Sequence, residues 1–250
     1  MFKKSYKQEE LDNILAKTKP RRGWNFSSMK VARQPVPWEY LDIVRLYLRT
    51  KDRVLDIGTG GGERFLELSK YFSQGVGVDI DPEMIKVARQ NARGHKNVLF
   101  KVDSEKLLKT TGKYNAILCR HAPYDLKVIY SRLLDNGYFI KQEVGEKNML
   151  NIKKVLNQYK NRSTVSRSGF IGADFNLVAF MEYNVEYVVQ DIESLVFWLQ
   201  ALDMLHSDME GGKALKNVEV LNKILNDNID KRGFVTNEHR YLVITQKAKR

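Results

Sequence analysis

The chain has 250 residues, of which 43% are hydrophobic and 29% are charged, a composition typical of a globular protein with a sizeable core. No apolar run reaches the roughly 18 residues that a membrane span requires, and the first residues lack the apolar stretch of a signal peptide. The only cysteine, Cys119, excludes an internal disulfide framework and a zinc site made of several cysteines. We therefore expect a cytoplasmic protein with no membrane partner.

The formal net charge of the chain is +12. Such a basic balance favours a polyanionic partner such as RNA. However, most of the lysines are scattered through helix-patterned stretches, which is typical of a solvated surface. The exceptions are two basic clusters, Lys17–Arg22 and Lys247–Arg250. The charge therefore leaves RNA open as a partner, and a solvated surface is the simpler interpretation.

The first fifty residues have the pattern of a helical extension. Residues Gln8–Lys17 have the apolar spacing of a short amphipathic helix, and a connector that contains proline and tryptophan follows over Pro20–Pro37. Proline is favoured in the first turn of a helix, so we expect a second helix from Pro37 to about Thr50. Residues 1–50 are therefore expected to form an amino-terminal helical extension that acts as a lid.

From Arg53 onward, short apolar strands alternate with amphipathic helices. The expected strands are Arg53–Ile57, Gly75–Ile80, Val98–Val102, Tyr114–Cys119 and Tyr138–Glu143. The expected helices are Glu63–Phe72, Pro82–Ala92, Ser104–Leu108 and Leu126–Leu134. This alternation is typical of an α/β fold with a mainly parallel sheet that is covered by helices on both faces.

The sequence pattern changes after Gly145. Glycines break the chain at Gly169–Gly172 and at Gly211–Gly212. We expect helices over Lys147–Tyr159, Ala173–Tyr183, Ile192–Leu205 and Leu215–Ile229, and strands over Val185–Val189 and Tyr241–Thr245.

The most informative segment is the stretch from Arg53 to Gly62. Its apolar residues form a buried strand that Asp56 interrupts, and Gly58, Gly60 and Gly62 follow at every second position. Glycine accepts positive φ angles and lets a ligand approach the main chain closely. A strand, a glycine loop and a helix in this order are typical of a nucleotide-binding cradle.

This loop and two later acidic residues resemble motifs of the class I S-adenosylmethionine-dependent methyltransferases. The resemblance covers about residues 52–145. The resemblance implies a Rossmann-like, mainly parallel seven-stranded sheet, with a methyltransferase domain over residues 51–250. Its cofactor half would be residues 51–145 and its substrate-side half residues 146–250. By the same resemblance, Asp79 receives the ribose hydroxyls and Asp103 the adenine amino group. The implied cofactor-binding residues are Asp56, Gly58, Thr59, Gly60, Gly62, Asp79, Ile80, Asp103, Ser104 and Arg120.

A dinucleotide-binding domain also has a glycine loop followed by an acid, but its fingerprint is G-x-G-x-x-G. The spacing here is G-x-G-x-G, with acids at three successive strand ends. A structural Rossmann-like domain without a cofactor is the second alternative. Other segments, such as Pro35–Trp38, Arg120–Ala122 and Lys141–Gly145, resemble a group of small bacterial-type methyltransferases that has no established acceptor.

The segment Arg120–Asp125 follows the fourth expected strand, where ligands bind in open α/β sheets. The tetrad His121–Tyr124 resembles the Asn/Asp-Pro-Pro-Tyr tetrad of amino-group methyltransferases, but it differs at two of the four places. His121 is a candidate base because the ordinary pKa of histidine lies near neutrality, or it caps the turn. Tyr124 is a candidate to stack on a flat acceptor, or it packs beside Pro123. Arg120 is a candidate to hold the cofactor carboxylate or an anionic substrate, or it is a surface residue.

Several other residues are candidates to frame the acceptor: Trp24, Phe26, Arg33, Trp38, Glu143, Trp198 and His206. Aromatic residues at helical spacing belong to a core more often than to a binding site. Cys119 ends an apolar strand and is expected to be a small core residue rather than a nucleophile. The four histidines lack the spacing of metal ligands, so no metal site is expected.

Three functions remain open at this point. The first is methyl transfer to a small molecule, which the aromatic inserts favour. The second is methyl transfer to rRNA or tRNA, which the net charge favours. The third is a regulator that binds the cofactor without catalysis.

Overall fold

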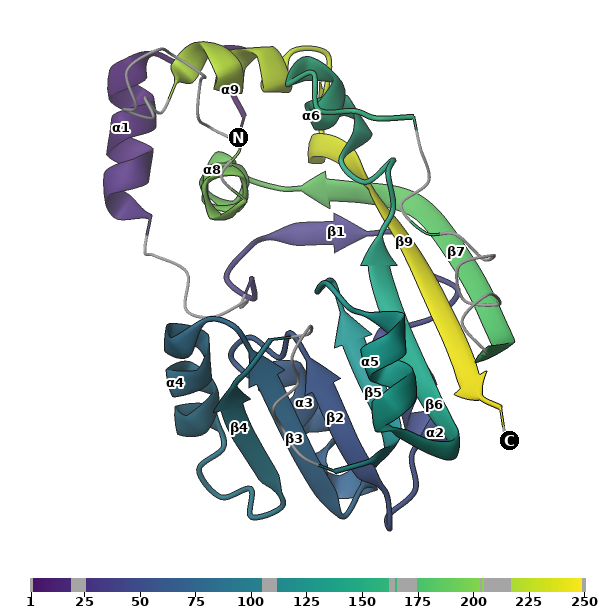
Figure 1. Ribbon diagram of the computed structural model, residues 1–250. Coiled ribbons are helices and arrows are strands. Elements are labelled where there is room, and N and C mark those ends of the chain that lie inside the picture. The colour runs from purple at the N-terminus through teal and green to yellow at the C-terminus, as the bar shows by residue number, and fades with distance from the viewer. Residues whose placement is uncertain are drawn as a thin grey trace.

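A computed structural model describes residues 2–18, 26–104, 112–161, 165, 175–202, 204 and 217–248. The molecule has two lobes (Figure 1): one is built on a twisted sheet, and the other is a group of helices above the carboxyl ends of the parallel strands. We call them the sheet lobe and the helical lobe. The strands are β1 (Val31–Arg33), β2 (Arg53–Ile57), β3 (Gln74–Asp79), β4 (Val98–Val102), β5 (Tyr114–Arg120), β6 (Leu133–Val144), β7 (Phe175–Val189), β8 (Ile229–Asp230) and β9 (Gly233–Lys247). The helices are α1 (Gln8–Lys17), α2 (Tyr40–Tyr47), α3 (Glu63–Glu67), α4 (Pro82–Asn91), α5 (Leu126–Arg132), α6 (Leu150–Val155), α8 (Ile192–Ala201) and α9 (Val218–Leu225), with a 3-10 turn at Ser69–Tyr71.

The strand order across the sheet is β4-β3-β2-β5-β6-β9-β7-β1. Strands β2 to β6 are parallel, whereas β9 is antiparallel to both of its neighbours, β6 and β7. Seven of these strands form the predicted mainly parallel sheet, and the structure adds two short ones, β1 at the edge beside β7 and β8 beside β9. The α/β, Rossmann-like fold class is therefore confirmed.

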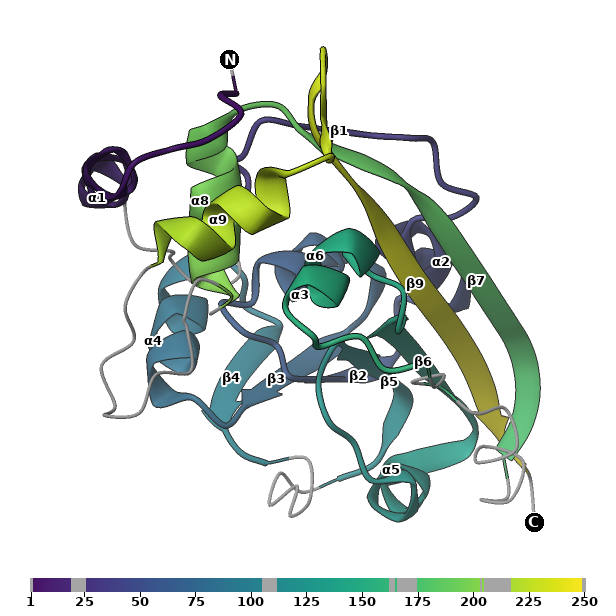
Figure 2. The same ribbon diagram turned by 90° about the horizontal axis from the view of Figure 1, so that it is seen from above.

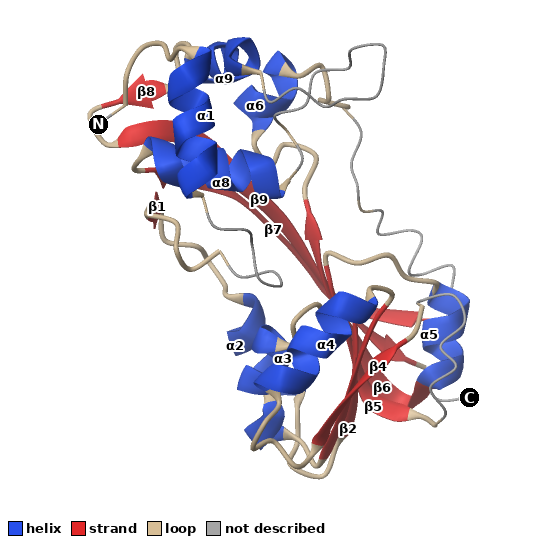
Figure 3. Ribbon diagram, turned by 90° about the vertical axis from the view of Figure 1, so that its left-hand side faces the viewer, coloured by secondary structure: helices blue, strands red, loops and turns tan. Residues whose placement is uncertain are grey.

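Helices cover both faces of the sheet lobe, with α2, α3 and α4 on one side and α5 on the other (Figure 3). The alternation within β2 shows why: Val54 packs with Phe65 and Ile85 on the first face, while Leu55 packs with Ile129 on the second. Side chains that follow one another along a strand point to opposite faces, so a strand that is apolar at both positions must be covered twice.

The helical lobe has a core of its own. Leu11 of α1, Ile152 of α6, Leu195 of α8 and Leu221 of α9 are fully buried in one cluster. The first fifty residues therefore take part in both lobes, because α1 packs in this cluster while β1 pairs with the sheet and Val44 of α2 belongs to the sheet core. Figure 2 shows that β7 and β9 run side by side along one side of the molecule, and in Figure 1 they extend from one lobe to the other.

The helix expected over Ala173–Tyr183 is wrong. The described part of that segment belongs to β7, which pairs with β9 from Phe175 to Val189. Its Leu, Ala, Met and Glu residues favour a helix, but fourteen residue pairs with β9 outweigh that propensity. For the same reason the last strand begins at Gly233, not at Tyr241, and both strands of this long antiparallel pair extend beyond the parallel sheet. Helices α6, α8 and α9 are shorter than expected.

Some predicted features lie outside the described residues. They include Trp24, the basic cluster after Thr18, the helix after Ser104, the glycines at Gly169–Gly172 and Gly211–Gly212, and His206. Within the ranges that the structure describes, no helix is long and apolar enough to cross a membrane.

Candidate functional site

The glycine loop between β2 and α3 depends on backbone conformations that favour glycine. Gly58, Gly60 and Gly62 have φ angles of +71°, +56° and +76°. The amides of Gly58 and Thr59 donate to the carbonyl of Val78, at 2.9 and 3.0 Å, which ties the loop to β3. A Cβ on Gly58 would stand 2.2 Å from the Cβ of Ala122, so the loop also contacts the segment after β5. The predicted cradle and the predicted acceptor segment therefore meet.

Asp79 ends β3 and is fixed by two backbone donors. The Gly60 amide donates to its Oδ2 at 2.9 Å, and the Asp81 amide donates to its Oδ1 at 3.0 Å. An ionised carboxylate has about four acceptor positions, so roughly two remain for a ligand. The amide of Asp103, just after β4, donates to the Asp79 carbonyl at 3.0 Å, which brings these two acids to one edge of the sheet.

Apolar side chains flank these acids. Ile80 is 66% exposed and Val102 is 51% exposed, each next to one of the two carboxylates. Exposed apolar side chains beside fixed polar groups are typical of a small-molecule site, where a flat ring lies on the apolar groups and hydrogen-bonds at its edge. The Ser104 amide donates to Asp103 Oδ1 at 2.8 Å and so orients that carboxylate. These residues fit a nucleoside with free ribose hydroxyls, which is what S-adenosylmethionine presents.

Asp56 lies between the glycine loop and β5. Desolvation by the surrounding protein raises the pKa of its carboxyl group to about 7, Asp79 adds to the rise, and Thr59 and Arg120 oppose it. Near neutral pH the group is therefore divided between its neutral and ionised forms. A positively charged ligand group beside it would favour the ionised form.

Arg120 and His121 are both held by Gln142, which is buried in β6. Arg120 Nε donates to Gln142 Oε1 at 2.7 Å, and the His121 amide donates to the Gln142 carbonyl at 3.0 Å. The guanidinium of Arg120 also lies 5.9 Å from the centre of the Tyr40 ring, which belongs to α2. Sequence reasoning found Arg120 and His121 but missed Gln142 and Tyr40. The only sequence feature that could have identified Gln142 is its position as a polar residue near the end of an apolar strand.

The pKa of His121 in the folded protein differs from the ordinary value for histidine. Desolvation lowers the pKa of the imidazole well below its usual value, and the charges of Arg120, Arg240 and Lys141 lower it further. The residue is nevertheless exposed to solvent. Its φ angle is +61°, which histidine adopts more readily than most side chains. His121 is therefore neutral at neutral pH, and protonating it is unfavourable.

Tyr124 is held by a buried lysine that sequence reasoning missed. Lys141 is 2% exposed, its Nζ lies 3.5 Å from the centre of the Tyr124 ring, and it forms an ion pair with Glu143. Burial raises the pKa of the Tyr124 hydroxyl to about 12, with a further contribution from Glu143. The ring also packs against Phe139 at 5.6 Å between centres. Tyr124 therefore presents a neutral hydroxyl near His121.

The remaining candidates divide between core and surface. Cys119 is fully buried, and burial raises the pKa of its thiol to about 12, so it is no nucleophile at neutral pH. Trp38 is 7% exposed and packs on Tyr183, so this predicted lid residue belongs to the core. Phe26 and Trp198 pack in the helical lobe, against Phe197 and Tyr187. Among the described residues, no group of three or more His, Cys, Asp or Glu side chains has the arrangement of a metal site.

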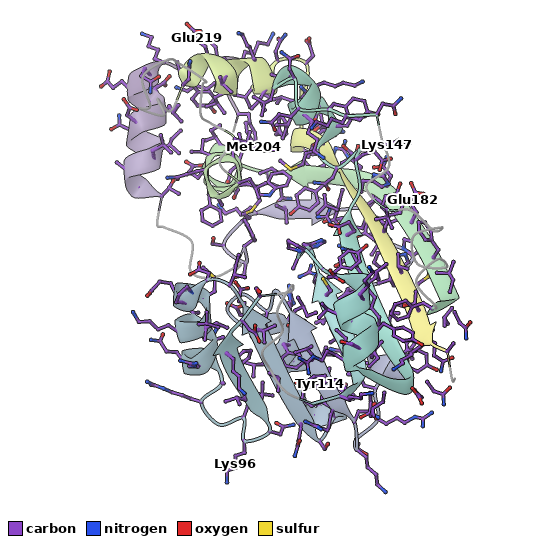
Figure 4. The ribbon with its side chains drawn as sticks, in the orientation of Figure 1. Lys96, Tyr114, Lys147, Glu182, Met204 and Glu219 are labelled. Atoms are coloured by element: carbon purple, nitrogen blue, oxygen red, sulfur yellow. The ribbon has the colours of Figure 1, made fainter. Side chains whose placement is uncertain are left out.

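Figure 4 places the edges of the sheet lobe. Lys96, just before β4, and Tyr114, at the start of β5, lie at the edge away from the helical lobe. The three acids and the segment after β5 therefore lie at the opposite edge, because they stand at or just beyond the carboxyl ends of parallel strands. Met204 lies in the helical lobe, and Glu182 lies on the β7 strand that leads to it. The site thus faces the helical lobe.

The chain is similar to known methyltransferases. A family model described as a methyltransferase domain matches residues 48–176, about half of the chain. An uncharacterized methyltransferase, YcgJ of Bacillus subtilis, is 33% identical over 98 residues, which is 38% of this chain and 39% of that protein. A ubiquinone biosynthesis O-methyltransferase of Xanthomonas oryzae is 31% identical over 145 residues, which is 53% of this chain and 59% of that protein. The matched regions thus span less than two thirds of either relative.

Solved structures agree on the fold. The crystal structure of YcgJ from Bacillus subtilis has a TM-score of 0.56 at 18% identity, over 84% of this chain and 99% of that one. At such identity the likeness concerns the fold alone. Because the family model covers about half of the chain, the chain belongs to the class I S-adenosylmethionine-dependent methyltransferase family.

Proposed function

We propose that this protein transfers the methyl group of S-adenosylmethionine to a small-molecule acceptor. The observation that carries the proposal is the glycine loop with three positive φ angles, flanked by the carboxylates of Asp56, Asp79 and Asp103 at one sheet edge. Membership of the methyltransferase family supports the choice of donor.

The donor would lie across β2, β3 and β4. Asp79 would accept from the two ribose hydroxyls, since both of its oxygens have acceptor positions to spare. Asp103 would accept from the adenine amino group, with Ile80, Val102 and Ser104 around the ring. Residues Asp56–Gly62 would lie under the methionine part, with Gly58, Thr59, Gly60 and Gly62 forming the cradle. The bound donor supplies an activated methyl group on a sulfonium.

The acceptor would lie beyond β5, next to the segment Arg120–Tyr124. Methyl transfer is an in-line displacement, so the protein must align the acceptor, exclude water and receive a proton where the acceptor carries one. His121 is neutral and has a free lone pair for that proton, but its surroundings oppose a lasting positive charge. It would therefore pass the proton on to solvent. The neutral hydroxyl of Tyr124 would orient the acceptor.

The choice of a small molecule rests on two observations. The relative from Xanthomonas oryzae is named for the biosynthesis of ubiquinone, which is a small molecule. In the described part of the chain many basic side chains near the sheet are in ion pairs, such as Arg33 with Glu238 at 3.1 Å and Arg64 with Glu67 at 2.8 Å. Paired charges contribute less to the binding of a polyanion than free ones.

One labelling experiment tests this choice. Purified protein and methyl-labelled S-adenosylmethionine are incubated with cell extract that has been separated into RNA, protein and small molecules. We expect label in the small-molecule fraction, and Asp79→Ala protein should give none. Label in RNA would favour the second function, whose binding should depend steeply on salt. Donor binding without label in any fraction would favour the regulator.

A further inference from the structure

Arg120 is fixed on one side and open on the other. Its Nε donates to Gln142 Oε1, and Gln142 is 3% exposed, so this contact is shielded from water. The guanidinium lies over the Tyr40 ring, whereas Arg120 as a whole is exposed. An arginine that is held through Nε presents its two terminal nitrogens as a planar fork, and this fork matches two oxygens of a carboxylate or a phosphate.

The neighbouring cations differ from Arg120 because each has a carboxylate partner. Lys141 is paired with Glu143, and Arg240 with Glu238 at 3.4 Å. Across the residues that the structure describes, the guanidinium of Arg120 forms no ion pair. The carboxylates of Asp56 and Glu238 act on Arg120 only from beyond ion-pair distance, so an anionic ligand in direct contact would lower the cost of keeping this partly desolvated cation.

The position of Arg120 points to the acceptor rather than to the donor. Its side chain bonds to Gln142 on β6, and Arg120 and Gln142 face each other across the two strands. Two of the donor acids, Asp79 and Asp103, are at β3 and β4, on the far side of β2, whereas Asp56 is in β2, next to β5. The fork is therefore anchored on the side of β5 where the acceptor is expected.

We infer that the methyl acceptor carries an anionic group, a carboxylate or a phosphate, and that Arg120 binds this group. The inference rests on the proposed function, because it names the substrate class for the same site. An anion next to the methyl group would also offset the positive sulfonium in a region that already holds Arg120, Arg240 and Lys141.

A binding experiment tests the anion site without the natural acceptor. Protein saturated with S-adenosylhomocysteine is titrated with benzoate, and with benzamide as the uncharged counterpart, by NMR. We expect benzoate to bind more tightly than benzamide, and Arg120→Gln to weaken benzoate binding by about 10- to 100-fold, the range for a hydrogen bond to a charged group. Arg93→Gln removes an exposed arginine after α4 and should change nothing. Equal benzoate affinity in Arg120→Gln and wild type would overturn the inference.

The donor is the other possible source of a carboxylate, so its affinity is measured too. S-Adenosylhomocysteine should bind Arg120→Gln within about twofold of wild type, whereas a tenfold loss would assign the fork to the donor carboxylate and overturn the inference.

The labelled product of the extract experiment gives a second readout. We expect an anion exchanger to retain the labelled small molecule at pH 8. Label only in uncharged or cationic products would overturn the inference and leave the proposed function intact. If no fraction is labelled, the proposed function fails, and the benzoate titration still decides whether Arg120 is an anion site.

Discussion

Gly58→Ala tests the contact between the glycine loop and the segment after β5. The new Cβ would stand 2.2 Å from the Cβ of Ala122, and the φ angle of +71° is unfavourable for alanine. The conformation costs roughly 1–2 kcal/mol and the overlap about 1–3 kcal/mol. We expect the free energy of unfolding to fall by about 2–5 kcal/mol in urea denaturation, and S-adenosylhomocysteine to bind more weakly.

Two further variants separate the two causes. Gly94 has a φ angle of +98°, and a Cβ added there would have no neighbouring atom within 4 Å, so Gly94→Ala should lose only the conformational part, roughly 1–2 kcal/mol. Combining Gly58→Ala with Ala122→Gly removes the overlap and keeps the strained φ. The coupling energy of this double-mutant cycle should be about 1–3 kcal/mol. A coupling below about 0.5 kcal/mol would refute the contact between the two loops.

Three further predictions concern groups whose pKa is shifted. The pKa of Asp56 is about 7 in the folded protein against 3.8 as its ordinary value, so its contribution to stability is complete below about pH 4 and is lost as the pH rises through 7. Without ligand, the unfolding free energy of wild type should fall by about 2 kcal/mol more than that of Asp56→Asn between pH 5 and pH 8; parallel pH profiles would contradict this. Iodoacetamide at pH 8 should leave native Cys119 unmodified, since the pKa of the buried thiol is about 12, and should alkylate it only in urea. His121→Asn keeps a residue that tolerates positive φ, and it should lower kcat by about 100-fold while the affinity for S-adenosylhomocysteine stays within twofold; unchanged kcat would make His121 structural.

The parallel half of the fold was predictable because its signals are local. Strands β2 to β6 carry their own apolar patterns, and the acids at 56, 79 and 103 stand at or next to the carboxyl ends of β2, β3 and β4. The antiparallel pair of β7 and β9 was not predictable in the same way. Its two strands are separated by more than forty residues along the chain. Only the pairing between them, in which Phe175 lies opposite Lys247 at one end, overrides the helical propensity of β7.

The residues of the candidate site likewise differ in whether the sequence alone could identify them. Candidate residues that belong to a sequence motif, such as Gly58 and Asp79, could be named from the sequence, and the structure brings them together. Residues that position others across the sheet were missed: Gln142 holds Arg120, and Lys141 holds Tyr124. Gln142 and Lys141 are polar residues of β6, the strand that begins at Leu133. The role of each depends on which residue of the neighbouring strand lies opposite it. That register is a property of the folded sheet.

The affinity for S-adenosylhomocysteine, measured by calorimetry on wild type, Asp79→Asn and Asp81→Asn, tests the central claim most directly. Both variants remove one negative charge, but Asp81 caps α4 by accepting from the Glu83 amide at 2.8 Å, whereas Asp79, which accepts from the Gly60 amide, is the residue proposed to bind the ribose. We expect Asp79→Asn to weaken binding by about 10- to 100-fold and Asp81→Asn by less than about threefold. Equal affinity in all three proteins, or no binding by wild type, would contradict the assignment of this edge of the sheet as the donor site.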